Sequence, residues 1–121
     1  MLIAYWIVAG LTALAFLAAG GMKVARAKEQ LVASGLAWAE DFALVQVKLI
    51  GAAEVLGALG LVLPMATGIL PVLSPIAGIC LAVIMVGAVV VHVRRHEPPA
   101  PAIVLALLAA ASAVLGFLAI G

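Results

Sequence analysis

Four long apolar runs, separated by short segments that are charged or rich in proline, make up the pattern of this 121-residue chain. An apolar run of about 20 residues is long enough to cross the hydrocarbon core of a bilayer as a helix. The pattern therefore predicts transmembrane helices at residues 2–22, 45–63, 73–93 and 102–120. We expect an all-α, integral membrane four-helix bundle that forms a single domain over residues 1–121.

The segment at residues 24–43, between the first two runs, is the most polar part of the chain. It mixes charged residues with apolar ones, Trp38 among them, which favours an amphipathic segment lying in the membrane interface. Ser34 and Gly35 are a predicted break within it. An ordinary solvated loop around a buried tryptophan explains the same pattern equally well, and a role in admitting a cytosolic substrate is a third interpretation.

Composition supports the membrane interpretation. Hydrophobic residues make up 69% of the chain and charged residues 9%, whereas soluble domains are about 45–50% apolar and about 25% charged. The lipid bilayer is therefore the expected surrounding. The net charge of +1 gives no indication of a nucleic-acid partner.

The basic residues predict how the chain crosses the membrane. Lys23, Arg26 and Lys28 follow the first run, and Arg94 and Arg95 follow the third, whereas the remaining loop and both termini have no lysine or arginine. Loops rich in lysine and arginine stay on the cytoplasmic side. We therefore expect both termini to be extracytoplasmic, in a multi-pass protein of a bacterial-type plasma membrane.

Glu54 lies inside the second apolar run, where a carboxylate normally faces packed protein or a water-filled cavity and is a candidate for function. Counted from Val45, it lies roughly 13 Å into the membrane, close to the midplane. Thr12 is expected at a similar depth on the first helix, and Lys48 and His92 nearer the cytoplasm. We expect these four polar residues, Glu54, His92, Lys48 and Thr12, to line one polar cavity.

Each candidate also has a structural explanation. Glu54 serves either as a proton or ligand site or as a protonated acid hydrogen-bonded between helices. His92 and His96 are four residues apart, a spacing that suits a metal, but no further histidine or second cysteine completes a ligand set, so we expect no metal site. His92 alone suits a contact to a quinone headgroup or a proton relay. No catalytic residue is assigned by the sequence.

Small residues on two helices predict close helix packing. Gly51, Gly57 and Gly60 lie on the second helix, and a face rich in alanine runs along residues 102–116 of the fourth. Small side chains let membrane helices approach closely. The face on the fourth helix suits packing within the chain or contact with a second copy, so a homo-oligomer is one expectation.

Three short motifs resemble those of the DoxX-like family of small four-helix integral membrane proteins. They are GxxExxGALGLxLP at residues 51–64, GGxK at residues 20–23 and AxxxHxRR at residues 88–95. The resemblance implies a four-helix bundle. It also implies a redox association, because the founding members of the family are small subunits associated with quinone-linked sulfur oxidation.

Three functions from different classes follow. The first is a small non-catalytic or accessory subunit associated with quinone-linked membrane oxidoreductase chemistry, for which quinone is a candidate cofactor and membrane or peripheral oxidoreductases are candidate partners; the sequence itself assigns no cofactor. The second is a small proton-coupled transporter in which Glu54 binds proton and substrate in turn. Four helices enclose little space, so this function requires at least a dimer. The third is a membrane assembly protein in which Glu54 only fixes how the helices pack.

Overall fold

The structure, a computed structural model, describes residues 1–33 and 36–121. The break predicted at Ser34 and Gly35 lies outside the described residues. Four long helices in the described part are long and apolar enough to cross a membrane. They are α1 (Leu2–Ala25), α3 (Leu44–Thr67), α4 (Leu73–Arg94) and α5 (Ala100–Ile120). The prediction of an all-α protein with four membrane helices is confirmed.

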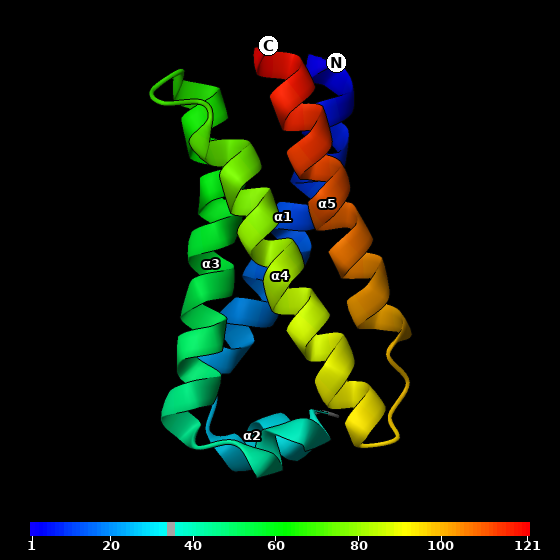
Figure 1. Ribbon diagram of the computed structural model, residues 1–121. Helices are drawn as coiled ribbons and strands as arrows, with labels where there is room; N and C mark the ends of the chain where they lie inside the picture. The colour runs from blue at the N-terminus through cyan, green and yellow to red at the C-terminus, as the bar shows by residue number, and fades with distance from the viewer. Residues whose placement is uncertain (34–35) are drawn as a thin grey trace.

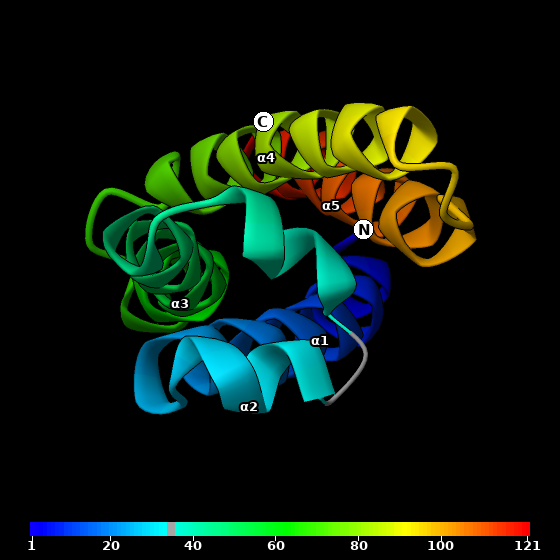
Figure 2. The same cartoon turned by 90° about the horizontal axis from the view of Figure 1, so that it is seen from below.

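The four long helices pack side by side in a ring, in the order α1, α3, α4, α5. Both termini lie at one end of this bundle, together with the connection between α3 and α4 (Figure 1). The opposite end holds two short elements, α2 (Lys28–Ala33) and the 3-10 helix η1 (Ala37–Asp41). Figure 2, seen from that end, shows both short elements lying across the bundle. We call this the charged end, because the described lysines and arginines lie on or next to it.

The long helices turn large apolar side chains outward and mostly smaller ones inward. Leucine, isoleucine and valine side chains on all four are exposed, as suits contact with lipid tails. The interior contains a cluster in which four large residues pack among three alanines: Phe16, Leu61, Leu81, Met85, Ala13, Ala58 and Ala109. With no hydrophobic driving force between helices in lipid, such close packing is what holds the bundle together.

The glycines of α3 contact two different helices. Gly51 faces α1, where an added β-carbon would lie 2.8 Å from the carbonyl oxygen of Gly20. An added β-carbon at Gly57 would lie 2.6 Å from the side chain of Leu81 on α4, and one at Gly60 would lie 2.9 Å from Ala77. Each of these helix contacts therefore depends on the absence of a side chain on α3.

The alanine face of α5 is used within the chain. Ala109 and Ala113 are buried, and a β-carbon added at Gly78 of α4 would lie 3.0 Å from the backbone of both. This close approach of backbones is the contact that small residues permit between membrane helices. The face that suggested a second copy is therefore largely covered by α4 of the same chain.

Helix α3 continues past Pro64, at which the sequence predicts its end. Proline has no N–H to donate within a helix, so the hydrogen bonding around it needs other partners. Two side chains from other helices supply them here. The Tyr5 hydroxyl donates to the carbonyl oxygen of Leu61 at 2.5 Å, and the backbone N–H of Met65 donates to the Ser74 hydroxyl at 3.1 Å. These contacts accommodate the proline inside the helix.

The segment that contains α2 and η1 has its own small apolar core. Leu31, Trp38 and Ala39 are buried together with Val47 from the first turns of α3. The Trp38 and Phe42 rings meet edge to face, with their centroids 5.6 Å apart. The segment is thus packed onto the charged end of the bundle through its apolar side chains.

Candidate functional site

Two matching motifs, Gly-x-x-Lys at residues 20–23 and Gly-x-x-Glu at residues 51–54, cross where α1 meets α3. A β-carbon added at Gly51 would lie 2.6 Å from the β-carbon of Lys23, and one added at Gly20 would lie 3.0 Å from the β-carbon of Glu54. Each glycine therefore makes room for the stem of the charged residue on the other helix. The two antiparallel helices bring the opposite charges together at this crossing.

Lys23 and Glu54 form a buried ion pair. The Lys23 Nζ lies 2.5 Å from Glu54 Oε1, and the two side chains are 9% and 0% exposed. A lone charge in a membrane interior is costly, whereas a pair of opposite charges in contact is neutral overall. The Lys23 Nζ also lies 5.6 Å from the centre of the Trp38 ring, within the range of a cation–π contact.

Glu54 has a second carboxylate oxygen that is unused. Among the described residues, Oε2 has no hydrogen-bond partner, although it is buried. Buried polar atoms are nearly always hydrogen-bonded, and one that is not requires an explanation. An ionised carboxylate accepts hydrogen bonds and donates none. The site therefore holds a free acceptor.

A cavity of about 480 Å³ lies beside this ion pair. Its volume is within the range of pockets that bind small molecules. Side chains from all four long helices and from the segment around η1 line it, and most of them are apolar: Ala19, Lys23, Leu36, Trp38, Phe42, Ile50, Glu54, Val83, Ile84, Met85, Gly87, Ala88, Val91, His92, Pro101, Ala102 and Leu105. These lining residues belong to the parts of the long helices nearer the charged end, where the ribbons of α3 and α4 diverge (Figure 1).

Two of the residues that line the cavity are exposed on α4. Val83, which lines it, is 65% exposed, and Gly87, one turn further along α4, is exposed as well. Toward the charged end the cavity is bounded by Leu36, Trp38 and Phe42. A largely apolar wall that includes exposed residues of a membrane helix suits a molecule that is dissolved in the bilayer.

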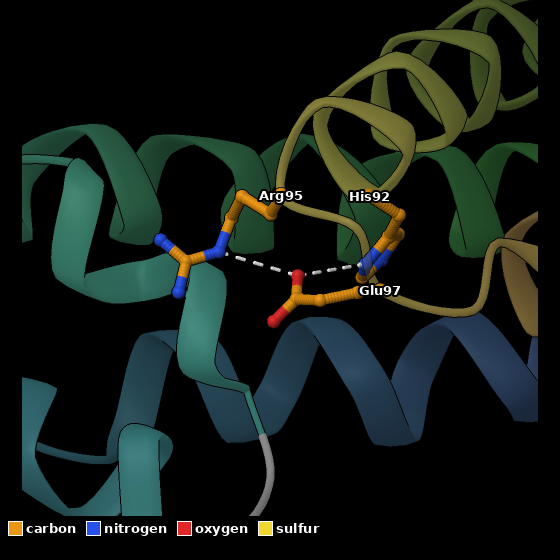
Figure 3. A network of polar contacts seen from close by, with 3 residues as sticks. All are labelled: His92, Arg95 and Glu97. Carbon is orange, nitrogen blue, oxygen red and sulfur yellow. Dashed lines mark hydrogen bonds and ion pairs between the residues drawn. The ribbon is translucent and has the colours of Figure 1, made fainter.

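His92 lies in the cavity wall at the end of α4. Its Nδ1 is 3.3 Å from Glu97 Oε1, and the Nε of Arg95 is 3.3 Å from the same oxygen. Figure 3 shows the Glu97 carboxylate between the other two side chains. The chain turns sharply here, with His96 in the left-handed region at φ 57°. This network ties the histidine to the start of the loop that leads to α5.

The structure brings two of the four predicted site residues, Glu54 and His92, into the wall of one cavity. The other two lie elsewhere. Thr12 is buried, donates to the Val8 carbonyl at 2.7 Å and accepts from Ser112 of α5 at 3.4 Å. The Lys48 Nζ donates to the carbonyl oxygen of Val24 at 2.5 Å, near the end of α1. Neither residue lines the cavity.

Lys23 is the residue that sequence reasoning missed as part of the site. In the sequence, Lys23 indicates only the orientation of the chain and the last position of GGxK. A signal was available, since Gly20 and Lys23 have the same spacing as Gly51 and Glu54. In two antiparallel helices that meet at their glycines, this spacing places the charged residues next to each other.

The site contains no arrangement typical of a resident metal ion. Within residues 1–33 and 36–121, no group of three or more histidine, cysteine, aspartate or glutamate side chains is placed to hold one. The polar chemistry described here thus consists of an ion pair, a free carboxylate oxygen and a histidine.

Four apolar helices around a cavity with an ion pair in its wall define the class: a small multi-span membrane protein with a pocket of ligand size. Comparison of the chain with models of known protein families identifies its family. The model of the DoxX-like family matches residues 7–114, and the chain belongs to that family. No curated protein and no solved structure matches the chain.

Proposed function

We propose that this protein is an accessory membrane subunit that holds a quinone for quinone-linked oxidoreductase chemistry carried out by partner proteins. The observation that carries the proposal is the cavity, which has a largely apolar wall that includes exposed residues of α4 and an ion pair within it. A quinone has the matching chemistry, with a polar ring on an apolar tail. The ring would lie beside Lys23, Glu54 and His92, and the tail would extend past Val83 toward the bilayer.

The residues at this site suit binding and proton handling more than covalent catalysis. The ammonium group of Lys23 is a hydrogen-bond donor and Glu54 Oε2 is an acceptor, whereas the second ring nitrogen of His92 donates or accepts according to the tautomer. Among the described residues that line the cavity, none is a nucleophile with an adjacent base. The proposal assigns electron transfer to a partner protein.

Binding is tested with the full chain in lipid nanodiscs. Trp38 lines the cavity, so a Trp6→Phe background leaves one fluorophore at the site. Decyl-ubiquinone and a short-chain menaquinone are the probes. We expect saturable quenching of Trp38 at a ratio near one quinone per protein.

Two matched substitutions distinguish binding from quenching by quinone dissolved in lipid. Ala88→Phe places a ring in the cavity wall, whereas Ala110→Phe makes the same change on the exposed side of α5. Saturable quenching should be lost in the first variant and kept in the second. Equal, unsaturable quenching in both would contradict a quinone site.

The alternatives are outcomes of the same measurement. A saturable change in Trp38 fluorescence on adding a water-soluble solute, with no effect of quinone, would favour the proton-coupled transporter. Trp38 fluorescence that changes with neither quinone nor any solute would favour the membrane assembly role. The oxidoreductase association is tested separately, by purifying the protein from its own membrane in mild detergent and assaying quinone reduction with and without it.

We further propose that the charged end faces the cytoplasm of a bacterial-type plasma membrane, with both termini outside. The distribution of lysine and arginine supports this orientation. The test introduces one cysteine at a time, at Ile69 or at Glu29, in a Cys80→Ser background. Both positions are exposed, and they lie at opposite ends of the bundle. A membrane-impermeant maleimide should label Ile69→Cys in intact spheroplasts and Glu29→Cys only after lysis. The reverse pattern would invert the proposed orientation.

A further inference from the structure

The facing sides of α3 and α4 bound the cavity near the charged end. In the half nearer the termini, a β-carbon added at Gly57 would lie 2.6 Å from the Leu81 side chain, so the two helices touch there. Ile50 is seven residues before Gly57 and Ala88 is seven residues after Leu81, so both stay on the facing sides, roughly 10 Å nearer the charged end. Both line the cavity. The ribbons of the two helices diverge in this direction (Figure 1).

Gly87 belongs both to the cavity wall and to the outer surface of α4. It lines the cavity and is exposed, and a β-carbon added there would have no atom of the described residues within 4 Å. Val83, one turn before it, also lines the cavity and is 65% exposed. The space at the side-chain position of Gly87 is therefore open, beside the place where the facing sides of α3 and α4 bound the cavity.

The position of Gly87 along α4 indicates which surroundings it faces. Seven residues separate it from Arg94, at which α4 ends, and this is roughly 10 Å along the helix. A charged side chain at the end of a membrane helix lies at the membrane surface. Gly87 is therefore at the level of the lipid tails, and its exposed neighbours Val86 and Val90 are apolar.

We propose that the cavity is loaded from the lipid, through a lateral mouth between α3 and α4 that Ile50, Val83 and Gly87 form. The molecule that uses this mouth is one that dissolves in the hydrocarbon of the bilayer. A quinone fits this requirement, since its ring can pass inward while its tail stays in lipid. A charged, water-soluble solute would have to give up its hydration to enter here, which is costly. This inference rests on the function proposed above, because it states how the ligand of that site enters.

A competing entrance has less support. Pro101, at the start of α5, is also exposed and lines the cavity, so an entrance there would open near the charged end. That end of the cavity is also bounded by the segment with Leu36, Trp38 and Phe42. At Gly87, by contrast, two exposed residues of the wall and an open side-chain position occur together. The lateral mouth is therefore the entrance that the structure favours.

The experiment measures how fast decyl-ubiquinone reaches the cavity, by stopped-flow quenching of Trp38 in nanodiscs that hold the full chain with Trp6→Phe. Nanodiscs without protein and with a pyrene-labelled lipid give the rate at which the quinone enters the bilayer itself. Gly87→Phe places a ring at the mouth. Val86→Phe places the same ring on the next residue of α4, which is exposed and does not line the cavity.

A narrowed mouth raises the barrier to entry and to exit alike, so both rates fall while the dissociation constant changes little. We expect quenching in Gly87→Phe to be about tenfold slower or more, a barrier increase of about 1.4 kcal/mol. Val86→Phe should keep the parent rate. Gly87→Ala should also keep it, and Gly87→Leu should be intermediate, which provides a second test should the phenylalanine variant fail to fold.

The outcomes separate the entrance from the site. Saturable quenching at the parent rate in both Gly87→Leu and Gly87→Phe would overturn the lateral mouth and leave the quinone site standing. Slower quenching in Pro101→Phe, with the parent rate in Gly87→Phe, would place the entrance at the charged end and overturn it as well. Weaker equilibrium quenching in Gly87→Phe at an unchanged rate would make residue 87 part of the binding surface instead. No saturable quenching in the parent would overturn the proposed function, and this inference with it.

Discussion

Breaking the Lys23–Glu54 ion pair from either side should have unequal effects on stability. Lys23→Met leaves the Glu54 carboxylate with 0% exposure and no counter-charge. Glu54→Leu leaves the Lys23 ammonium, whose side chain is 9% exposed and which lies two residues before the end of α1 at Ala25. A long lysine side chain near a helix end can extend its charge to the membrane surface. Glutamate at position 54 has no such route.

The magnitudes follow from this asymmetry. Removing one partner of a buried pair typically lowers the free energy of unfolding by about 3–5 kcal/mol, and we expect Lys23→Met to fall in that range. Because the Lys23 side chain can reach water, Glu54→Leu should lower the free energy of unfolding by only about 1–2 kcal/mol. The double variant Lys23→Met/Glu54→Leu replaces the pair with apolar side chains and should return to within about 1 kcal/mol of the parent.

The assay is reversible unfolding in mixed micelles of dodecyl maltoside and sodium dodecyl sulfate, followed by circular dichroism. Lys48→Met is the matched control, since Lys48 donates to a single backbone carbonyl outside the cavity and its loss should reduce stability by about 1 kcal/mol or less. A double variant as unstable as the sum of the two single variants would refute the reasoning, because it would show that the two charges do not interact.

Three further predictions concern packing and are measured by the same unfolding assay. Gly51→Ala should lower the free energy of unfolding by about 1–3 kcal/mol, because its β-carbon would lie 2.6 Å from that of Lys23, whereas Gly10→Ala, with open space around it, should be neutral or slightly stabilising. Equal effects would show that α1 and α3 do not meet at Gly51. Tyr5→Phe should lower the free energy of unfolding by about 1–2 kcal/mol, because the Leu61 carbonyl loses its donor. An unchanged free energy of unfolding would show that the Tyr5 hydroxyl does not donate to this carbonyl. Gly68→Ala should lower the free energy of unfolding by about 1 kcal/mol, because Gly68 has φ 73°, a left-handed conformation. An unchanged free energy of unfolding would argue against a left-handed backbone at residue 68.

The four membrane helices were predictable because the requirement that sets them is local. Backbone groups in lipid must be satisfied within the segment, so a long apolar run has little choice but to form a helix. The exact ends were less predictable. Helix α3 continues to Thr67 because Tyr5 and Ser74, distant in sequence, supply hydrogen bonds around Pro64. Such support depends on tertiary contacts that no local pattern contains.

The site was only partly predictable for a related reason. Glu54 is conspicuous in an apolar run, but its partner depends on how α1 and α3 are aligned. Counting depth from the expected helix ends places Thr12 at the level of Glu54. The contact at the glycines instead places Gly20 there, eight residues further along α1, which is roughly 12 Å at the rise of an α-helix. The alignment is set by the fit of two surfaces, which depth counting ignores.

The same packing explains why the cavity lies where it does. Gly51 lets α3 pack closely against α1 near the charged end. Gly57 and Gly60 let α3 pack closely against α4 in the half of the bundle nearer the two termini. The glycine of α3 nearest the charged end, Gly51, thus faces α1 rather than α4. The two helices therefore diverge, and the segment with Trp38 bounds the resulting space rather than filling it. The ion pair and the cavity are thus adjacent because the close contact of α1 with α3 at Gly51 lies in the half of the bundle where α3 and α4 diverge.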